Sequence, residues 1–195
     1  MTTNVTDAQD SHPWAADLAQ LYAQIWVHLA RGVHDPRAPA RHLTLGTMGL
    51  NGFAQLRTVV LRGCDAQAGT LDIYTDAASA KVGQLRENPR AGLHVWDASA
   101  QLQTRIEAEV EIIRGDQLMD LWAGLSDEVQ MNFGCTPPTG APIAASLGYK
   151  KHPDPGTFTV LRAHVCAIDA VHLGPVHRRA RFARADGWAG QWFVP

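Results

Sequence analysis

The stretch 57-RTVVLR-62 decides the fold and raises the question of function. Its four central residues are β-branched or aliphatic and favour a half-buried β-strand. The flanking arginines, Arg57 and Arg62, are either the solvated ends of that strand or binding groups for an anionic ligand. Because side chains alternate along a strand, positions five apart face opposite ways unless a bulge intervenes. The two arginines are therefore not expected to hold one phosphate together.

Strand patterns continue on both sides of this stretch. Strands are expected at residues 43–48, 53–61, 70–75, 91–96, 101–113, 157–168, 171–173 and 188–194. Asn51-Gly52 is expected to form a two-residue hairpin turn between the first two strands. Helices are expected from Pro13 to a stop at Gly32, with Ser11 as a cap, and at 76–88 and 116–125.

Mostly antiparallel strands, with helices at the ends and in the connections, predict a mainly β (α+β) fold built on a closed or partly closed β-barrel. We expect a single domain over residues 13–195, after a flexible tail at residues 1–12.

The composition is that of an ordinary globular protein and excludes several classes. Of 195 residues, 46% are hydrophobic and 18% are charged, which is not the balance of a disordered chain. A formal net charge of −2 and the lack of a long basic run argue against a nucleic-acid partner. No apolar stretch reaches the ~20 residues that span a bilayer, and the polar N-terminus has no signal-peptide core. We therefore expect a cytoplasmic protein without a membrane partner. The three cysteines and nine histidines fall in no metal-binding spacing, so no metal site is expected.

The junction 74-YTDAASAK-81 has the residues of a phosphate site. It joins a strand to a helix, and the first backbone N–H groups of a helix are unpaired and carry partial positive charge. Thr75 and Ser79 add hydroxyl donors, Lys81 adds a full charge, and Arg57 lies on the neighbouring strand. A capped helix with a solvated lysine would explain the same residues, and the junction alone does not decide between the two interpretations.

Four segments, taken in order, resemble the pyridoxamine 5′-phosphate oxidase-like superfamily of FMN-binding split barrels. They are RTVVLR, the run YTD-x-x-S-x-K, ENPRAGLHVW and LQTRIEAEVE. The tryptophan-containing N-terminal helix and the loop before TLGTMGLNG look more like another branch of that superfamily than the vitamin B6 oxidase itself. The resemblance runs from about residue 14 to the C-terminus and is most specific between residues 43 and 113.

The resemblance implies a homodimer with FMN at its interface. It assigns Arg57 to the phosphate, Arg62 to the ring end of the flavin, and Gln103 to a position facing the ring. The strand between the two arginines would run beside the flavin, the YTD-x-x-S-x-K run would form the phosphate cradle, and a basic residue of HRRARF would be a further contact. The candidate cofactor-binding residues are Arg57, Thr58, Val59, Val60, Leu61, Arg62, Tyr74, Thr75, Ser79, Lys81, Gln103 and Arg181.

The function implied is that of a flavin-dependent oxidoreductase acting on a small molecule, with the flavin supplying the redox chemistry. No side chain is assigned as a catalytic acid or base. A non-catalytic flavin-binding or storage protein, a deazaflavin- or haem-binding split barrel, and a purely structural barrel with surface arginines remain open.

Two departures from the family pattern bear on this function. Ala80-Lys81 stands where the family often has Arg-Lys, so the cradle has one cation fewer. The segment Gly115–Tyr149 contains no Lys, Arg or His and four acidic residues. That composition is unsuited to the phosphorylated substrate of the vitamin B6 oxidase, because the substrate phosphate would lose charge-assisted hydrogen bonds.

Overall fold

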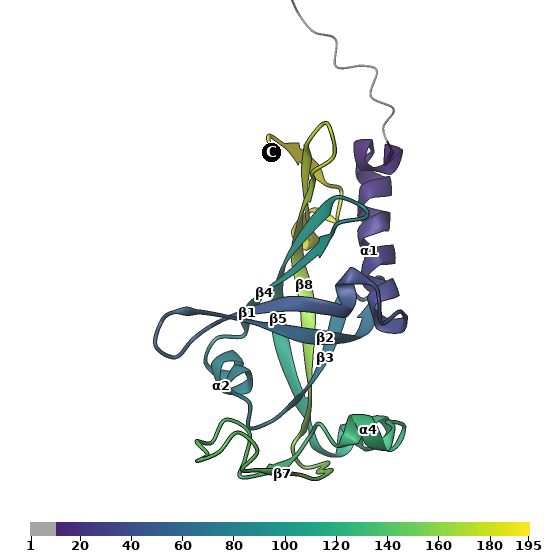
Figure 1. Cartoon of the computed structure of the whole chain (residues 1–195). Coiled ribbons are helices and arrows are strands. Elements are labelled where there is room, and N and C mark those ends of the chain that lie inside the picture. Colours follow the sequence, from purple (N-terminus) through teal and green to yellow (C-terminus); the bar gives the residue numbers. More distant parts are fainter. Residues whose placement is uncertain (1–10) are drawn as a thin grey trace, which may run out of the picture.

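The predicted β-barrel is confirmed by the computed structural model, which describes residues 11–195 (Figure 1). Most of the predicted tail at residues 1–12 lies outside the described residues. Six antiparallel strands close in the order β8-β3-β2-β1-β4-β5, and β5 pairs back to β8. These strands are β1 (His42–Met48), β2 (Ala54–Asp65), β3 (Thr70–Asp76), β4 (Arg90–Asp97), β5 (Leu102–Arg114) and β8 (Phe158–His172).

Shorter elements extend or cover the barrel. The sheet continues from β8 through β9 (Arg178–Ala183) to β10 (Gln191–Phe193), while β6 (Cys135–Thr136) and β7 (Lys150–Lys151) form a separate pair. The α-helices are α1 (Leu18–His34), α2 (Ala80–Glu87), α3 (Met119–Ala123) and α4 (Asp127–Gln130). The 3-10 turns are η1 (Pro13–Ala16), η2 (Pro39–Arg41), η3 (Gly115–Leu118) and η4 (Arg184–Asp186). No helix of the described residues is long and apolar enough to cross a membrane.

The N-terminal helix packs on the barrel with the face that its apolar period predicts. Leu21, Ile25 and Leu29 of α1 are buried in the main core with the inward residues of the strands. The predicted ends were wrong. Asp17 caps α1 by accepting a hydrogen bond from the Gln20 N–H at 2.8 Å. Gly32 lies inside the helix, and a Cβ there would lie 2.7 Å from the Ala40 carbonyl carbon, so this glycine permits close packing and does not stop the helix.

The β1–β2 hairpin is longer than a two-residue turn and projects from the barrel (Figure 1). Met48 pairs with Ala54, so five residues form the loop, and the prediction of an Asn51-Gly52 two-residue turn was wrong. The Gly49 N–H donates to the Phe53 carbonyl at 2.9 Å, and Gly52 adopts a positive φ of 81°. This closure leaves apolar side chains at the tip exposed to solvent.

One strand, β8, takes the place of two predicted ones. Its first half lies between β3 and β5, and its second half lies between β5 and β9. The register with β5 shifts between Glu107 and Ala108, so Cys166 is an extra residue in β8. Such a bulge bends a strand and increases its twist. It lies between the β3-paired and β9-paired parts of β8.

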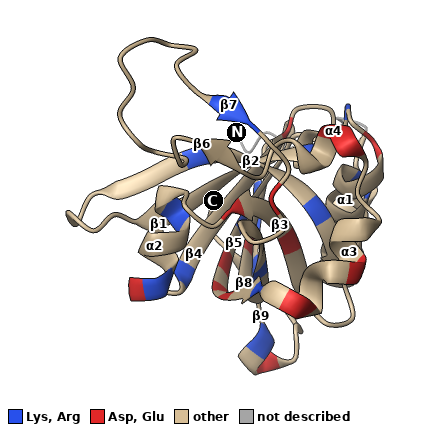
Figure 2. Ribbon diagram, turned by 90° about the horizontal axis from the view of Figure 1, so that it is seen from below, with Lys and Arg blue, Asp and Glu red and all other residues tan. Residues whose placement is uncertain are grey.

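The predicted helix at 116–125 is divided into η3 and α3, and α4 was not predicted. Gly115, with a φ of 79°, turns the chain out of β5 into this segment. Its apolar residues join a second, smaller core with Phe158 and Val160 of β8, and Tyr74 of β3 packs against that core. The helical segment therefore packs on the outer side of the sheet, at the C-terminal end of β3 and the N-terminal end of β8. In Figure 2 the red segments of the ribbon mark the acidic residues of α3 and α4.

Candidate functional site

Arg57 of β2 lies next to α2, where its guanidinium donates to three neutral oxygens. Its Nη1 donates to the Leu45 carbonyl at 3.3 Å and to the Thr47 hydroxyl at 2.5 Å, and its Nη2 donates to the Gln84 carbonyl oxygen at 2.9 Å. Thr47 also donates to the same Gln84 oxygen at 2.7 Å. Arg57 shares the face of β2 that carries the buried Val59, so its side chain turns inward toward α2.

The strand-to-helix junction places Thr75, Ser79 and Lys81 together, as predicted from the run 74–81. Lys81 Nζ donates to Thr75 Oγ1 at 2.9 Å, and the Thr75 and Ser79 hydroxyls are 3.1 Å apart. Ser79 is the N-cap residue of α2, yet its side chain does not cap the helix. The first turn of α2 therefore retains backbone N–H groups that are not satisfied by a side chain, beside a lysine and two buried hydroxyls.

Two cations in this group, Arg57 and Lys81, lie close together. Among residues 11–195, no acidic side chain forms an ion pair with Arg57 or Lys81. Burial lowers the pKa of Arg57, and burial together with the charge of Arg57 lowers the pKa of Lys81. The nearby Asp76 acts in the opposite direction on Lys81, but its two oxygens accept backbone N–H bonds from Ala78 and Gly134.

A phosphate fits these donors. Two half-buried cations raise each other's energy, and an anion that accepts hydrogen bonds from both removes that penalty. The helix N-terminus adds partial positive charge from the same side. We call this group, comprising Thr47, Arg57, Thr75, Ser79, Lys81 and Gln84, the phosphate cradle.

The other residues of 57-RTVVLR-62 divide between the two faces of β2. Val59 and Leu61 are buried in the main core, so only their backbone can run beside a ligand, while Thr58 and Val60 lie on the opposite face. Arg62 stands at a bulge, because Leu61 pairs with Ile73 while Gly63 pairs with Asp72.

Arg62 belongs to a different environment from Arg57. Burial and the charge of Arg41 lower the pKa of Arg62, and the Tyr74 phenol acts in the opposite direction. The Tyr74 ring packs edge-on against Phe158, with their centroids 5.3 Å apart. The structure thus places Arg62 and Tyr74 near each other and separates Tyr74 from Thr75, since neighbouring residues of β3 face opposite ways.

Gln103 and Arg181 lie on the outer surface of the barrel. Gln103 of β5 is flanked by the buried Leu102 and Thr104 and shares the outward face with Glu107. Arg181 of β9 donates to both carboxylate oxygens of Glu107, at 3.0 and 3.2 Å. Neither residue contacts the phosphate cradle.

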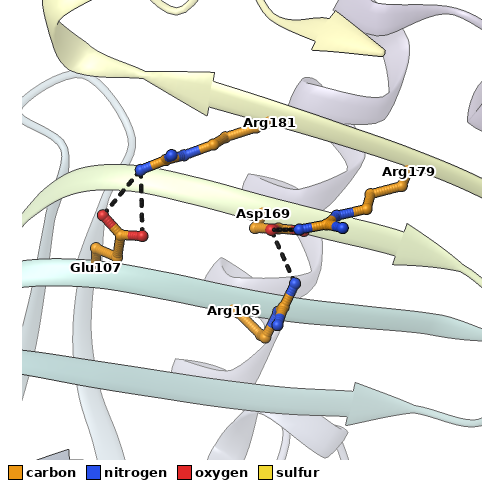
Figure 3. Close-up of polar contacts among 5 residues, drawn as sticks. All are labelled: Arg105, Glu107, Asp169, Arg179 and Arg181. Carbon is orange, nitrogen blue, oxygen red and sulfur yellow. Dashed lines mark hydrogen bonds and ion pairs between the residues drawn. The ribbon is translucent and has the colours of Figure 1, made fainter. Parts of the chain in front are cut away.

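A second ion-pair group lies beside Arg181, and Figure 3 shows its side chains converging from β5, β8 and β9. Arg105 and Arg179 each donate to Asp169 Oδ2 at 2.8 Å. Burial alone would raise the pKa of Asp169, but the hydrogen bonds from Arg179 and Arg105 outweigh it and hold that pKa below its usual value.

An open pocket of about 550 Å³ lies over this outer surface. The glycines Gly46 and Gly92 pair across β1 and β4 and leave its floor without side chains. A second pocket of about 590 Å³ shares those glycines and Glu107. Beside both, the β1–β2 hairpin exposes Leu50, Phe53 and Leu56 to more than 70%. An apolar surface of this kind next to pockets is typical of a contact surface.

Thr47 and Gln84 were not identified from the sequence. Thr47 belongs to a strand that carries no motif of its own, and only the β1–β2 register brings it to Arg57. Gln84 could have been found, because it follows Lys81 by three positions and such residues are neighbours on a helix surface.

Comparisons with known proteins give this geometry a context. Residues 12–114 match the family model described as pyridoxamine 5′-phosphate oxidase, FMN-binding domain. A pyridoxine/pyridoxamine 5′-phosphate oxidase of Xanthomonas euvesicatoria is 33% identical over 183 residues, which cover 92% of this chain and 78% of that protein. One of Synechocystis sp. is 36% identical over 89 residues, which cover 46% of this chain and only 40% of that protein's length. The crystal structure of a pyridoxamine 5′-phosphate oxidase-related, FMN binding protein from Nostoc punctiforme is similar with a TM-score of 0.73 at 26% identity, covering 89% of this chain and 96% of that one.

Proposed function

Since the chain belongs to the pyridoxamine 5′-phosphate oxidase family of FMN-binding split barrels, with FMN as its cofactor, we propose that it is a flavin-dependent oxidoreductase acting on a small molecule. Each flavin is held between two copies of the chain. When bound, FMN would supply the hydride-transfer chemistry, and the protein would hold and orient it.

The observation that carries this proposal is the pair of cations in the phosphate cradle. Arg57 and Lys81 are half-buried and repel each other, and their hydrogen-bond partners within residues 11–195 are neutral. The FMN phosphate carries about two negative charges at neutral pH and accepts hydrogen bonds on three oxygens. It therefore pairs with both cations and with the N–H groups of α2. Because Ala80 stands where the family often has an arginine, the FMN phosphate is bound by Arg57, Lys81 and the N-terminus of α2 alone among the groups of this cradle.

A second copy of the chain supplies the groups for the ring. Gln103 and Arg181 lie on the outer surface, whereas Arg57 faces inward, so one chain does not present all three to one ligand. A partner docked on the exposed hairpin and the two adjoining pockets brings its own Gln103 and Arg181 to this chain's cradle. Burying an exposed phenylalanine such as Phe53 stabilises such a contact by roughly 1.5–3 kcal/mol.

The substrate is uncharged or cationic rather than a phosphate ester. The helical segment that packs against Tyr74 carries Asp116, Asp120, Asp127 and Glu128 and contributes no basic side chain. A phosphate dianion beside this segment would meet repulsion instead of charge-assisted hydrogen bonds. Although curated relatives are named as oxidases of pyridoxine or pyridoxamine 5′-phosphate, we expect a different substrate here.

Purification followed by mass spectrometry of the released ligand tests the cofactor, and anaerobic reduction by candidate electron donors tests the activity. We expect FMN at close to one molecule per chain, and repeated reduction and reoxidation in the presence of a small-molecule substrate. Bound FMN that no donor or substrate turns over would support a storage protein instead. Haem or a deazaflavin released in place of FMN would contradict the proposal.

A further inference from the structure

Arg57 differs from the arginines that pair with carboxylates, since it donates only to neutral oxygens among residues 11–195, as Arg41 and Arg184 also do. Arg162 donates to both oxygens of Asp72, Arg105 and Arg179 donate to Asp169, and Arg181 donates to Glu107. A carboxylate partner neutralises an arginine and competes with any anionic ligand. Arg57 donates to an amide oxygen, a hydroxyl and a backbone carbonyl, all of them neutral.

The amide of Gln84 is the centre of this arrangement. Gln84 is buried on α2, one turn after Lys81, and its carbonyl oxygen accepts from Arg57 Nη2 at 2.9 Å and from Thr47 Oγ1 at 2.7 Å. Thr47 in turn accepts from Arg57 Nη1. The three side chains therefore form a closed ring of hydrogen bonds, which fixes the guanidinium plane without adding a negative charge.

We propose that Gln84, together with Thr47, is a positioning residue that aims Arg57 at the FMN phosphate and leaves its charge available to it. The proposal rests on the proposed function, because it takes the phosphate cradle as the FMN phosphate site. Gln84 does not touch the cofactor and acts through Arg57. The choice of an amide over a carboxylate at this position determines whether the cradle has two available cations or only one.

Two substitutions separate this electrostatic role from a merely structural one. Gln84→Glu keeps the oxygen that accepts from Arg57 and Thr47 and the shape of the side chain, but replaces the amide NH2 with a second oxygen and so places a carboxylate on Arg57. Gln84→Met removes both hydrogen bonds and adds no charge. A structural role predicts that the methionine variant is the worse of the two in every assay. The electrostatic role predicts that the glutamate variant is the worse in FMN binding, although it is the more stable.

The experiment measures dissociation constants for FMN and for riboflavin, which lacks the phosphate, by flavin fluorescence on apo-protein, together with thermal unfolding. For Gln84→Glu we expect FMN affinity to fall about 10- to 100-fold, with riboflavin affinity and unfolding temperature unchanged or the latter raised. For Gln84→Met we expect a smaller, less than about tenfold, loss for FMN and a lower unfolding temperature. Gln67→Glu, at an exposed turn position, is the matched control for the added charge.

Each result bears on the proposal. FMN binding by Gln84→Glu that equals wild type, or a greater loss of FMN affinity in Gln84→Met, would overturn it. A glutamate variant that fails to fold would also overturn it, because an ion pair to Arg57 should hold the fold at least as well as the amide does. A wild-type protein that binds riboflavin as tightly as FMN would instead contradict the phosphate site itself, and so the proposed function.

Discussion

Two variants that each lose FMN should restore each other when they are mixed. One carries Arg57→Ala and has a defective phosphate cradle. The other carries Gln103→Ala and Arg181→Ala and has a defective outer surface. If every FMN site takes its cradle from one chain and its outer surface from the other, a mixed dimer has one intact site and one site with all three changes.

The expected magnitudes follow from the contacts. Arg57 is desolvated and free of acidic partners among residues 11–195, so its charge-assisted bond to phosphate contributes about 1.5–3 kcal/mol, and its loss weakens FMN roughly 10- to 100-fold. Arg181 is exposed and already paired with Glu107, so its loss lies near the lower end of that range. Random exchange of chains makes about half of the dimers mixed, and about a quarter of all sites regain wild-type affinity.

The assay titrates FMN into each variant and into an equimolar mixture that has been dissociated and reassociated. The mixture should give a two-phase curve with a tight phase of about a quarter of the sites, which neither variant shows alone. The matched control mixes Arg57→Ala with Lys81→Ala, because two cradle defects leave no intact site in any mixed dimer. Absence of the tight phase from the first mixture, or its presence in the control, would refute a site shared between chains.

Four further outcomes are expected. Burial and the charge of Arg57 lower the pKa of Lys81, and a bound phosphate raises it again. FMN affinity should therefore decline as the pH rises through the lowered pKa of Lys81, before the ordinary value of 10.5 is reached. Equal FMN affinity across an alkaline titration series would disprove this. Phe53→Asp, at a side chain that is 71% exposed, should weaken dimer association at least about tenfold in sedimentation while leaving the monomer folded; an unaltered dimer would contradict the docking surface. Pyridoxamine 5′-phosphate should be a poor substrate of the FMN-loaded protein, and turnover at the rate of a dedicated oxidase would show the substrate class to be wrong. Burial raises the pKa of the Cys64 thiol to about 11, whereas the ordinary value is 9.0. Alkylation of Cys64 at neutral pH, followed by mass spectrometry of peptides, should therefore be about 100-fold slower than that of an ordinary thiol. Labelling at the ordinary rate would contradict the burial of Cys64.

The barrel and its cofactor could be predicted from local patterns, because their signals are local. The strand period around Arg57 and the polar junction before Lys81 are each contained in a few residues, and the order of these motifs is specific to the family. The same alternation correctly indicated that Arg57 and Arg62 have different surroundings. The bulge at Arg62 was not predicted, because it depends on how β3 pairs with β2.

The parts that could not be predicted depend on contacts between distant segments. Glycine disfavours helices, so Gly32 predicts a helix stop, but its close contact with Ala40 explains its place inside α1. The bulge at Cys166, which lies between the β3-paired and β9-paired parts of β8, was not predicted, and two shorter strands were predicted instead. The spacing of Gln84 from Lys81 places the two side chains near each other on α2, but its contact with Arg57 depends on how α2 packs against β2.

The position of β8 in the chain has a consequence for the order of folding. β8 is the last barrel strand to be synthesised, and it must pair with β3 on one side and β5 on the other. Asp76 and Phe158, which pair across β3 and β8, are separated by 82 positions (158 minus 76). Until β8 is added, the nascent chain exposes two unpaired strand edges that another chain could join. Because distant strand pairing requires the closure of a long loop, barrel closure should be the slow step of folding, during which the chain is most exposed to aggregation.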